Sequence, residues 1–501
     1  MILLALILLL LSGGFLAWLV GLYRADTARW VSLAVLAVAG LLVAVVWQGG
    51  TLQNVEAGIS GSGLWYSTLK LPWIPRFGIS LLLAVDGLSL MLIALTIFLG
   101  VVAVVSSWNQ VEYRHGFFQF NILWTLAGVV GVFAALDLFL FFVFWEVMLI
   151  PMYLLIAIWG HEDRAYASMK FFLFTQVSGL LLLVSILVLA FAHYQSSGVL
   201  SFSYFDLLNT ELSKGLAFWL MLGFFVAFVV KLPGVPLHTW LPDAHTQAPT
   251  AGSVILAGIL LKTGAYGLIR FVVPLFPEAA IEFRWPAMCL GAVSVVYGGY
   301  LAYAQNDFKR LVAYSSISHM GFVLLGVFAW NAIALQGAIM QMIAHGFSTA
   351  ALFMLAGALQ ERLHTRDLDK MGGIWMQAPR MGAVALFFIV ASLGMPGLGN
   401  FVGEFMVLIG IFAVDIPLTV VAALGLVIAA IYGLSLMQRA FQGHSHQGKS
   451  TVDASVPDFG LRELSVMAAM MVALVYLGVY PQPLFDMAAP VVEHLLSGGA
   501  P

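Results

Sequence analysis

Long apolar segments separated by short polar ones recur along the whole of this 501-residue chain. A helix needs about 20 mainly apolar residues to cross the hydrocarbon core of a bilayer. The pattern therefore predicts an all-α integral membrane protein with fourteen transmembrane helices. Their approximate bounds are 2–22, 29–48, 79–106, 116–136, 137–159, 167–194, 215–233, 251–273, 286–304, 308–329, 333–360, 380–413, 417–440 and 463–480.

The polar segments between the spans are short, so residues 1–501 are expected to form a single polytopic membrane domain. The longest of them, residues 48–78, is predicted to be a loop anchored at the membrane surface by Trp65 and Trp73. The first apolar segment begins at Met1, with no basic segment before it and no A-x-A cleavage site after it. It is therefore interpreted as a retained helix and not as a signal peptide.

Composition supports the membrane assignment and excludes several classes of function. The chain is 62% hydrophobic and only 9% charged, which is incompatible with a water-soluble globular protein. A single cysteine, Cys289, supplies neither a disulfide nor a ligand set for haem or an iron–sulfur cluster. The sequence has no P-loop and no dinucleotide-binding glycine motif, so no cofactor is expected to bind this chain.

The distribution of lysine and arginine predicts the orientation of the chain in the membrane. Loops that follow odd-numbered spans carry fourteen of the 21 basic residues, whereas loops that follow even-numbered spans carry four, namely Lys70, Arg76, Lys214 and Arg284. Because basic loops stay in the cytoplasm, both termini are predicted to lie on the periplasmic side.

Two of the predicted spans are interrupted. In the seventh, Lys231 lies about 24 Å along the helix, and Pro233 and Pro236 follow at once. Proline has no N–H, so the carbonyls of Val229 and Leu232 are expected to lose their helical partners. The twelfth span is interrupted at Pro396 and Gly397.

An internal repeat links the two interruptions. Asp137 opens the fifth span and Asp307 opens the tenth, an offset of 170 residues, and the broken spans at Lys231 and Glu404 are offset by 173. Five helices, an odd number, then repeat, so the two units must be inverted relative to one another. The sequence thus predicts inverted five-helix repeats at about residues 116–273 and 286–440, an arrangement in which paired broken helices mark a transport site.

Three ionisable residues are predicted near the middle of the membrane in the first repeat. Glu146 lies about nine residues into the fifth span, Lys231 lies before the first break, and Lys262 lies about eleven residues into the eighth span. One interpretation is that Glu146 and Lys231 form only a structural ion pair. Ionisable groups inside a membrane mark proton paths more often, and buried pairs add little stability, so a proton-carrying role is favoured.

The second repeat contributes two histidines and a carboxylate. His319 follows Ser315 by four residues, and His345 follows Gln341 by four, so each imidazole shares a helix face with a polar side chain. Proton exchange is favoured over simple packing for both, because histidine exchanges protons near neutral pH. Glu404 follows the second break and is either the last proton-carrying group or an organiser of the break.

Further polar residues have simpler interpretations. His238, Asp243 and His245 lie in the first break, where proton uptake is favoured over a metal site because the proline-interrupted backbone does not fit helical ligand spacing. His444 and His446 are expected to be solvated, and Asp137 is expected to cap its helix.

Five stretches of the chain resemble one family, the antiporter-like membrane subunits of bacterial NADH:quinone oxidoreductase, respiratory complex I. They are PWIPRFGISLLLAVDGLSL, FFVFWEVMLIPMY, KLPGVPLHTWLPDAHTQAPTAGSVILAGILLKTGAYG, AYSSISHMGFVLLG and GMPGLGNFVGEFMVL. Within the family, Glu404 resembles the M type, because the L and N types carry lysine at this position.

The resemblance implies a fourteen-helix fold with proton uptake through one broken-helix half-channel and release through the other. It places the family's glutamate–lysine pair on Glu146 and Lys231, its connecting groups on Lys262, His319 and His345, and its exit carboxylate on Glu404. It further implies that NADH, flavin and iron–sulfur clusters bind other subunits, and that quinone reacts outside this chain. Neighbouring antiporter-like subunits and lipid are the implied partners, in the bacterial cytoplasmic (inner) membrane.

Three alternatives remain open from the sequence. The chain could be a subunit of a multi-chain cation/proton antiporter or of a membrane-bound hydrogenase, and co-purifying proteins distinguish these from the first interpretation. It could also be a passive scaffold, in which case neutralising the four buried charges would affect assembly alone. Quinone chemistry in this chain is a weaker option, because no polar pocket motif for quinone is present.

Overall fold

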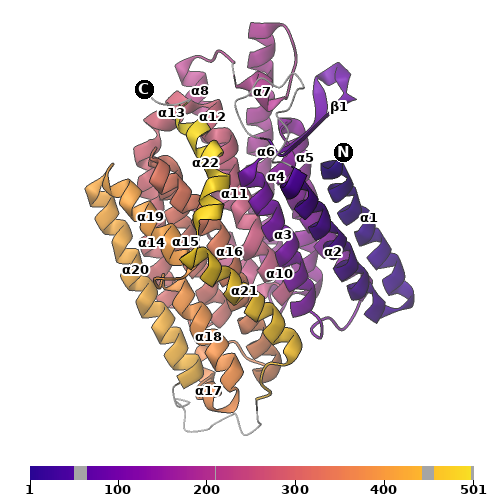
Figure 1. Cartoon of the computed structure of the whole chain (residues 1–501), viewed down its shortest axis with the longest axis vertical. Coiled ribbons are helices and arrows are strands. Elements are labelled where there is room, and N and C mark those ends of the chain that lie inside the picture. Colours follow the sequence, from indigo (N-terminus) through magenta and orange to yellow (C-terminus); the bar gives the residue numbers. More distant parts are fainter. Residues whose placement is uncertain (50–64, 209, 443–455, 498–501) are drawn as a thin grey trace.

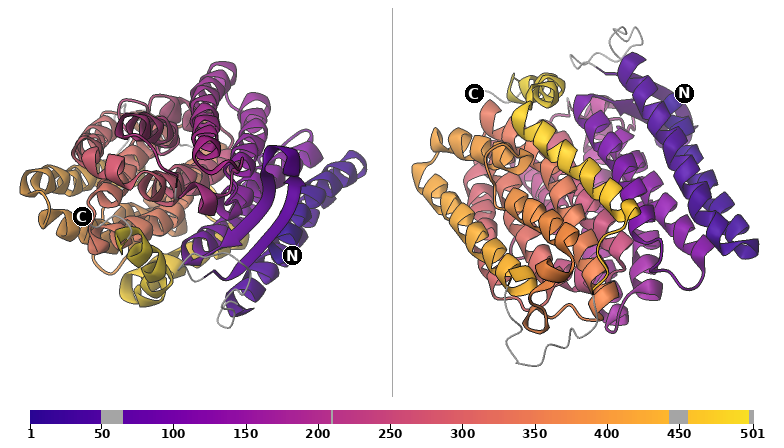
Figure 2. Two further views of the ribbon diagram at one scale, coloured as in Figure 1. Left: turned by 90° about the horizontal axis from the view of Figure 1, so that it is seen from above. Right: turned by 60° about the horizontal axis from the view of Figure 1, so that its bottom comes forward.

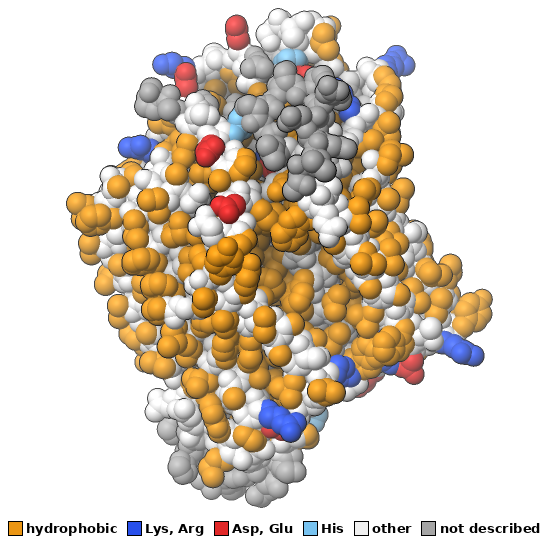
Figure 3. All heavy atoms as spheres, viewed as in Figure 1, with side chains coloured by type: hydrophobic (Ala, Val, Ile, Leu, Met, Phe, Trp, Pro, Cys, Tyr) orange, Lys and Arg blue, Asp and Glu red, His pale blue; other side chains and the backbone are white. Residues whose placement is uncertain are grey.

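The computed structural model describes residues 1–49, 65–208, 210–442 and 456–497. His444 and His446, predicted to be solvated, lie outside the described residues. The helices stand side by side along the long axis, with the first two at one edge of the bundle and α20 at the other (Figures 1 and 2). On the face drawn in Figure 3, hydrophobic side chains form a broad belt, and charged side chains gather toward the two ends.

Thirteen helical segments of the described residues are long and apolar enough to cross a membrane. In chain order they are α1 (Ile2–Tyr23), α2 (Ala25–Gly49), α3 (Gly87–Ser106), α4 (His115–Ala134), α5 (Leu138–Trp159), α6 (Arg164–Ser197), α8 (Lys214–Lys231), Thr250–Leu275, α14 (Arg284–Tyr303), α15 (Phe308–Phe328), α16 (Ala332–Leu363), Ile416–Gln442, which begins with α20 (Ile416–Met437), and α21 (Leu461–Val479).

The predicted twelfth span is divided into two shorter apolar helices, α18 (Pro379–Ser392) and α19 (Gly399–Phe412). With these two halves counted as one, the described residues hold the fourteen spans that the hydrophobic pattern predicts. Between the halves, Gly394 and Gly397 adopt φ angles of 75° and 93°, which side chains with a Cβ rarely tolerate. The predicted interruption at Pro396 and Gly397 is therefore confirmed.

The seventh span breaks where the prolines predict, but its carbonyls are better satisfied than expected. Helix α8 ends at Lys231, and the chain becomes helical again in α9 (Trp240–Gln247). The Val229 carbonyl loses its usual partner at Pro233 and accepts instead from the N–H of Gly234 at 3.0 Å. The predicted loss of its helical partner is therefore confirmed, and the unwound chain, which turns back on the end of its own helix, supplies another donor.

The third span begins later than predicted, because residues 79–85 form a strand. Strand β1 (Ser67–Ile74) pairs antiparallel with β2 (Ile79–Val85), and the turn between them contains Gly78 with a φ of 67°. A short apolar segment fits a buried strand as well as a helix, so the pattern alone does not separate them. Asp86 then caps α3 by accepting a hydrogen bond from the Ser89 N–H at 3.0 Å.

Trp65 is not the interfacial anchor that the sequence predicts. Its side chain is buried beside the hairpin, where the Arg270 guanidinium lies 5.4 Å from the ring centroid. That arginine also pairs with Asp86, so the hairpin and the start of α3 are tied to the eighth span. Trp73 remains exposed.

Two features of the helices were not anticipated. The fully buried eighth span, Thr250–Leu275, contains two π-helical segments, Leu256–Leu260 and Leu268–Val272, each of which widens the helix by one residue. The chain also adds a final helix, α22 (Gln482–Ser497), which packs against α3 and α16 (Figure 1).

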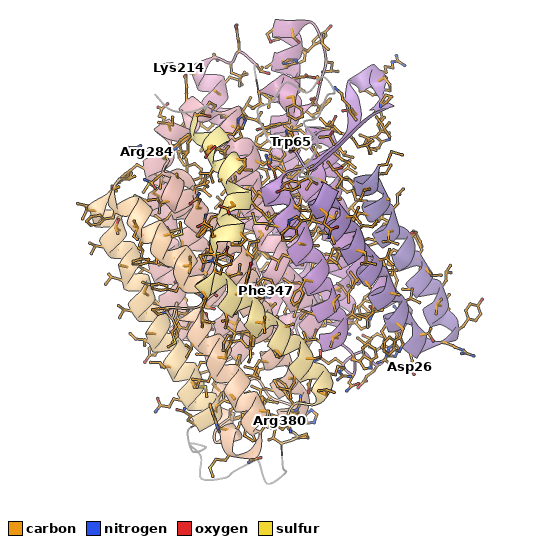
Figure 4. All side chains as sticks on the ribbon, in the orientation of Figure 1. Asp26, Trp65, Lys214, Arg284, Phe347 and Arg380 are labelled. Atoms are coloured by element: carbon orange, nitrogen blue, oxygen red, sulfur yellow. The ribbon has the colours of Figure 1, made fainter. Side chains whose placement is uncertain are left out.

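In the part of the chain that the structure describes, four short helices and two 3₁₀ turns connect the spans. They are α7 (Tyr204–Leu207), α9, α13 (Pro277–Glu282) and α17 (Ile374–Gln377), with 3₁₀ turns at Pro75–Phe77 and Leu368–Lys370, whereas the π segment Gln438–Gln442 extends α20. Successive loops lie at opposite ends of the bundle, with Asp26 and Arg380 at one end and Lys214 and Arg284 toward the other (Figure 4).

Candidate functional site

A buried polar cluster lies beside the second break. The His319 Nδ1 atom, on α15, is 2.6 Å from Oε1 of Glu404, on α19. Gln341, on α16, donates from Nε2 to the same carboxylate oxygen at 2.9 Å. The other ring nitrogen of His319 is 3.1 Å from the hydroxyl of Ser392, the last residue of α18. Four helices thus converge on one histidine–glutamate contact from which the protein excludes bulk solvent.

A second polar contact continues the cluster toward the first repeat. Lys262, completely buried on the eighth span, is 2.7 Å from Nδ1 of His345 and donates to the Ala257 carbonyl at 2.6 Å. The centroids of the His345 and His319 rings are 5.4 Å apart. Lys262, His345, His319 and Glu404 therefore form an unbroken series of neighbours through the interior of the protein, which we call the central line.

The polar neighbours of the two histidines differ from those predicted. The Ser315 hydroxyl donates to the backbone of its own helix, so His319 contacts Ser392 instead. The side-chain amide of Gln341 donates its hydrogen bond to Glu404 rather than to His345. Helical spacing identified residues on the correct faces, but it did not reveal which other helix each face meets.

The buried Lys231 and the half-buried Glu146 lie near each other without forming an ion pair. The Lys231 ammonium has no hydrogen-bond partner among the described residues and lies 5.3 Å and 5.4 Å from the ring centroids of Trp145 and Phe171. Glu146 interacts electrostatically with Lys231 and bonds to Gln176 of α6. Among the described residues no ion pair joins Glu146 to Lys231, so the interpretation of a structural salt bridge is wrong.

Comparisons with known proteins identify the family of the chain. Residues 135–430 match the family model described as NADH:quinone oxidoreductase/Mrp antiporter, TM. NADH-quinone oxidoreductase subunit M of Escherichia coli strain K12 is 52% identical over 497 residues, which cover 98% of this chain and 96% of that protein. Subunit M of Pseudomonas aeruginosa PAO1 is 53% identical over 495 residues, with the same coverage of both chains. The chain belongs to the family of NADH-quinone oxidoreductase subunit M.

Solved structures extend the comparison to the fold of this family. A chain of respiratory complex I from Thermus thermophilus, solved with bound NADH, superposes with a TM-score of 0.88 at 31% identity, and all of both chains is covered. The membrane-bound sulfane sulfur reductase shares the fold alone, with a TM-score of 0.83 at 23% identity over 96% of this chain and 77% of that one. The expected family, the multi-pass membrane location and the antiporter-like helical fold are thereby confirmed.

The three polar residues of the first break have separate surroundings in this family member. Asp243 is paired with Lys170 at 2.6 Å and with Arg310 at 3.4 Å. His238 lies beside the rings of two tyrosines. His245 is completely buried, stacks on Phe353 at 4.4 Å and has no hydrogen-bond partner on either ring nitrogen.

No group of three potential metal-ligating side chains occurs in the part of the chain that the structure describes. The spacing of His238, Asp243 and His245 therefore does not become a ligand set. The three residues lie in three different environments. Of the three, only His245 lies toward the central line.

The structure adds two polar residues that sequence reasoning missed as site residues. Lys309, counted only as a loop cation, is completely buried one residue into α15. Its ammonium donates to the Ala248 carbonyl at 3.1 Å and lies 3.4 Å from Nε2 of His161. Lys309 stands two residues after the capping Asp307, and no sequence signal shows that its side chain turns inward.

His161 borders a polar cavity of about 470 Å³ at the end of the bundle where the loops after α5, α14 and α16 meet. The cavity is lined by His161, Glu162, Asn306, Asp307, Gln360, His364, Thr365, Arg366 and Asp367. Burial, and then the nearby positive charges of Lys309 and Arg366, lower the pKa of His161 to about 3. The imidazole is therefore neutral at neutral pH and able to accept a hydrogen bond from Lys309.

Proposed function

We propose that the chain carries protons across the bacterial cytoplasmic membrane as a membrane-arm subunit of a NADH:quinone oxidoreductase. The curated relatives are named as subunits of that enzyme, and one solved relative is a chain of respiratory complex I. The observation that carries the proposal is the central line. It joins ionisable groups of both repeats inside the membrane-spanning helices, where side chains are normally apolar.

The central line has the chemistry of a proton relay. Protonated Lys262 can give a proton to Nδ1 of His345 over 2.7 Å, so that one N–H bond breaks as another forms. The Nε2 atom of His345 has no hydrogen-bond partner within the described parts of the chain, which leaves it able to release a proton toward His319. His319 then contacts the Glu404 carboxylate, the last group in the series.

Proton uptake is assigned to the polar cavity and the two residues behind it. His161 and Lys309 stand between the cavity and the interior, and His245 interacts electrostatically with both Lys309 and Lys262. A proton from the cavity would pass Lys309 and His245 to reach Lys262. In this assignment Asp243, with its two cationic partners, holds α9 in place instead of carrying protons.

Lys231 and Glu146 are assigned the control of the relay. Their charges attract each other without direct contact, so a change at Glu146 would alter how strongly Lys231 holds its proton. A neighbouring antiporter-like subunit would impose that change from outside, because Glu146 is only partly buried in the isolated chain. NADH, flavin, iron–sulfur clusters and quinone are assigned to other subunits.

Matched anchors support the proposed inverted repeats at residues 116–273 and 286–440. Asp137 caps α5 and forms a β-bridge with Ser203, after α6. Asp307 caps α15 and forms a β-bridge with Asp367, after α16. The same local construction thus recurs at the start of corresponding helices. The odd number of spans between the two anchors would place them at opposite membrane surfaces, with both chain termini periplasmic.

Replacing Lys309 with Met tests the proposed uptake route. The substitution keeps an unbranched side chain but removes the proton carrier, so we expect NADH-driven proton translocation to fall by at least about tenfold, equivalent to about 1.4 kcal/mol of barrier. Lys370→Met, at an exposed lysine in the loop after α16, should leave translocation unchanged. Proton uptake by proteoliposomes containing the whole complex measures both. Equal rates in the two variants would exclude Lys309 from the route.

Replacing Gly394 with Ala tests the proposed exit beside the second break. A Cβ at this position would lie 3.1 Å from Oε2 of Glu404, and the φ of 75° is strained for alanine by about 1 kcal/mol or more. We expect translocation to slow severalfold while NADH oxidation by uncoupled membranes is retained. Gly198→Ala is the matched control, because Gly198 also has a positive φ but meets no atom within 4 Å. A similar loss in both variants would indicate a general effect of backbone strain.

Identification of the partners tests the assembly itself. The complex should be extracted in mild detergent through an affinity tag on this chain, and the proteins that accompany it should include a NADH-oxidising, flavin-containing subunit. Recovery with antiporter or hydrogenase subunits instead would overturn the assignment to NADH:quinone oxidoreductase.

A further inference from the structure

A surface cleft lies between α1 and α4, far from the central line in the sequence and outside the proposed relay. Its volume is about 330 Å³, and its lining is mainly apolar: Trp18, Gly21, Leu22, Arg114, Gly116 and Phe117. The last turn of α1 and the first turn of α4 form its two walls. Helix α1 lies at the edge of the bundle and packs on the inner helix α4, and the cleft is close to the end marked by Asp26 (Figure 4).

Two glycines form the floor of the cleft. A Cβ added to Gly21 would lie 2.4 Å from the Cα of Gly116, so the backbones of α1 and α4 touch at this point. Larger side chains stand around that contact, with the rings of Trp18 and Phe117 5.5 Å apart. Leu22, at the mouth, is 67% exposed. The result is a narrow apolar recess whose walls fit a flexible hydrocarbon chain.

Positive charge stands at the polar end of this recess. Arg24 follows the last residue of α1, and Arg114 precedes the first residue of α4. Both are exposed, and within the described residues neither forms an ion pair. The nearby Arg29 differs, because it bonds to Asp26 and to the Trp108 carbonyl. Glu112 is the closest carboxylate in the sequence to Arg114, and it too is exposed and outside those ion pairs.

We propose that this cleft binds an anionic phospholipid. The phosphate lies between Arg24 and Arg114, and the upper part of one acyl chain occupies the recess between Trp18, Leu22 and Phe117. Guanidinium groups suit phosphate because they present several N–H donors in a fixed plane. Basic pockets between membrane helices, with an apolar recess below them, match the two parts of a lipid molecule.

The arrangement of the cleft favours lipid over a protein segment. Its charged end and its apolar recess follow one another along the helix axis, which is the direction in which a lipid lies in a bilayer. The site stands apart from the proposed relay, so its occupancy and the proton-carrying role are tested independently. The expected consequence of binding is a fixed crossing of α1 over α4.

Counting bound lipid in the purified complex tests the proposal. Complex washed free of loosely held lipid and reloaded with phosphatidylglycerol should retain about one molecule more than the Arg24→Gln/Arg114→Gln variant, by native mass spectrometry. Leu22→Trp, which fills the mouth of the recess, should lose the same molecule without any change in charge. Arg380→Gln, an exposed arginine at the same end of the bundle, is the control and should bind as the unaltered complex does.

Three results would overturn the proposal. The first is an unchanged lipid count in both cleft variants, which would mean that the cleft is empty or covered by another subunit. The second is an equal loss in the Arg380→Gln control, which would show a general effect of surface charge. The third is equal retention of phosphatidylcholine, whose headgroup has no net charge, which would remove the role of the two arginines.

Discussion

Replacement of Lys231 with Ala is expected to abolish coupled proton translocation while the complex still assembles. Where the structure describes the chain, the ammonium has no hydrogen-bond partner, and its neighbours are the rings of Trp145 and Phe171. Its removal leaves no protein donor or acceptor unpaired, so the fold should survive. Translocation should fall by at least about tenfold, or about 1.4 kcal/mol of barrier, because the proposed relay loses the group that responds to Glu146. NADH-driven acidification of proteoliposomes provides the measurement, with native gel electrophoresis as the check on assembly.

The same helix offers a matched control. Lys214, the first residue of α8, is exposed at the end of the bundle (Figure 4). Lys214→Ala removes an identical charge from the same helix, so it should leave translocation unchanged. Full translocation by Lys231→Ala would remove the buried lysine from the mechanism, and loss in both variants would point to a structural requirement of α8.

The lack of an ion pair between Glu146 and Lys231 has a mechanistic implication. A direct salt bridge would hold Lys231 in its charged form and make proton release costly. Here the two groups interact through space, and aromatic rings occupy the position of a direct partner. A small movement of α5 or a change in charge next to it can therefore shift the balance at Lys231. The proposed control at Lys231 would therefore be graded and electrostatic, and would not require a contact to be broken.

The sequence was sufficient to predict the architecture wherever one local physical effect dominated. Hydrophobic length identified the fourteen spans, and proline with glycine identified both interruptions, because these effects act locally along the chain. The hairpin of β1 and β2 was missed because a short apolar segment is compatible with either a strand or a helix. The π-helical segments of the eighth span were also missed, since the apolar pattern does not distinguish a π turn from an α turn in a fully buried helix.

The candidate site was predicted in its members but not in its contacts. Buried charges stand out in an apolar sequence, so Lys262 and Glu404 were identifiable without coordinates. The hydrogen bond from Gln341 to Glu404 joins two residues that are 63 positions apart in the sequence, and no helical periodicity predicts it. Lys309 was assigned to a loop because it lies beside a helix start, where residue spacing does not reveal whether a side chain turns inward.

Replacement of Glu404 with Gln is the second substitution with a large expected effect. Glutamine preserves the shape of the side chain and an oxygen that accepts from Gln341, but it neither carries a negative charge nor takes up a proton. The proton that reaches His319 then has no acceptor, so translocation should fall by at least about tenfold with assembly intact. Glu404→Asp, which keeps the carboxylate, should restore a measurable fraction of the rate.

Gln341→Met separates proton transfer at Glu404 from simple support of the second break. This substitution removes one hydrogen bond to the carboxylate, worth about 1 kcal/mol, but leaves the proton acceptor in place. We expect less than about a threefold change in translocation, measured in the same proteoliposomes across a series of pH values. If Gln341→Met and Glu404→Gln were equally impaired at every pH, Glu404 would act by organising the break, and the central line would end at His319. A loss confined to Glu404→Gln, with partial recovery in Glu404→Asp, would instead require the carboxylate itself, as expected for the terminal acceptor of a relay that leaves through the interrupted helix.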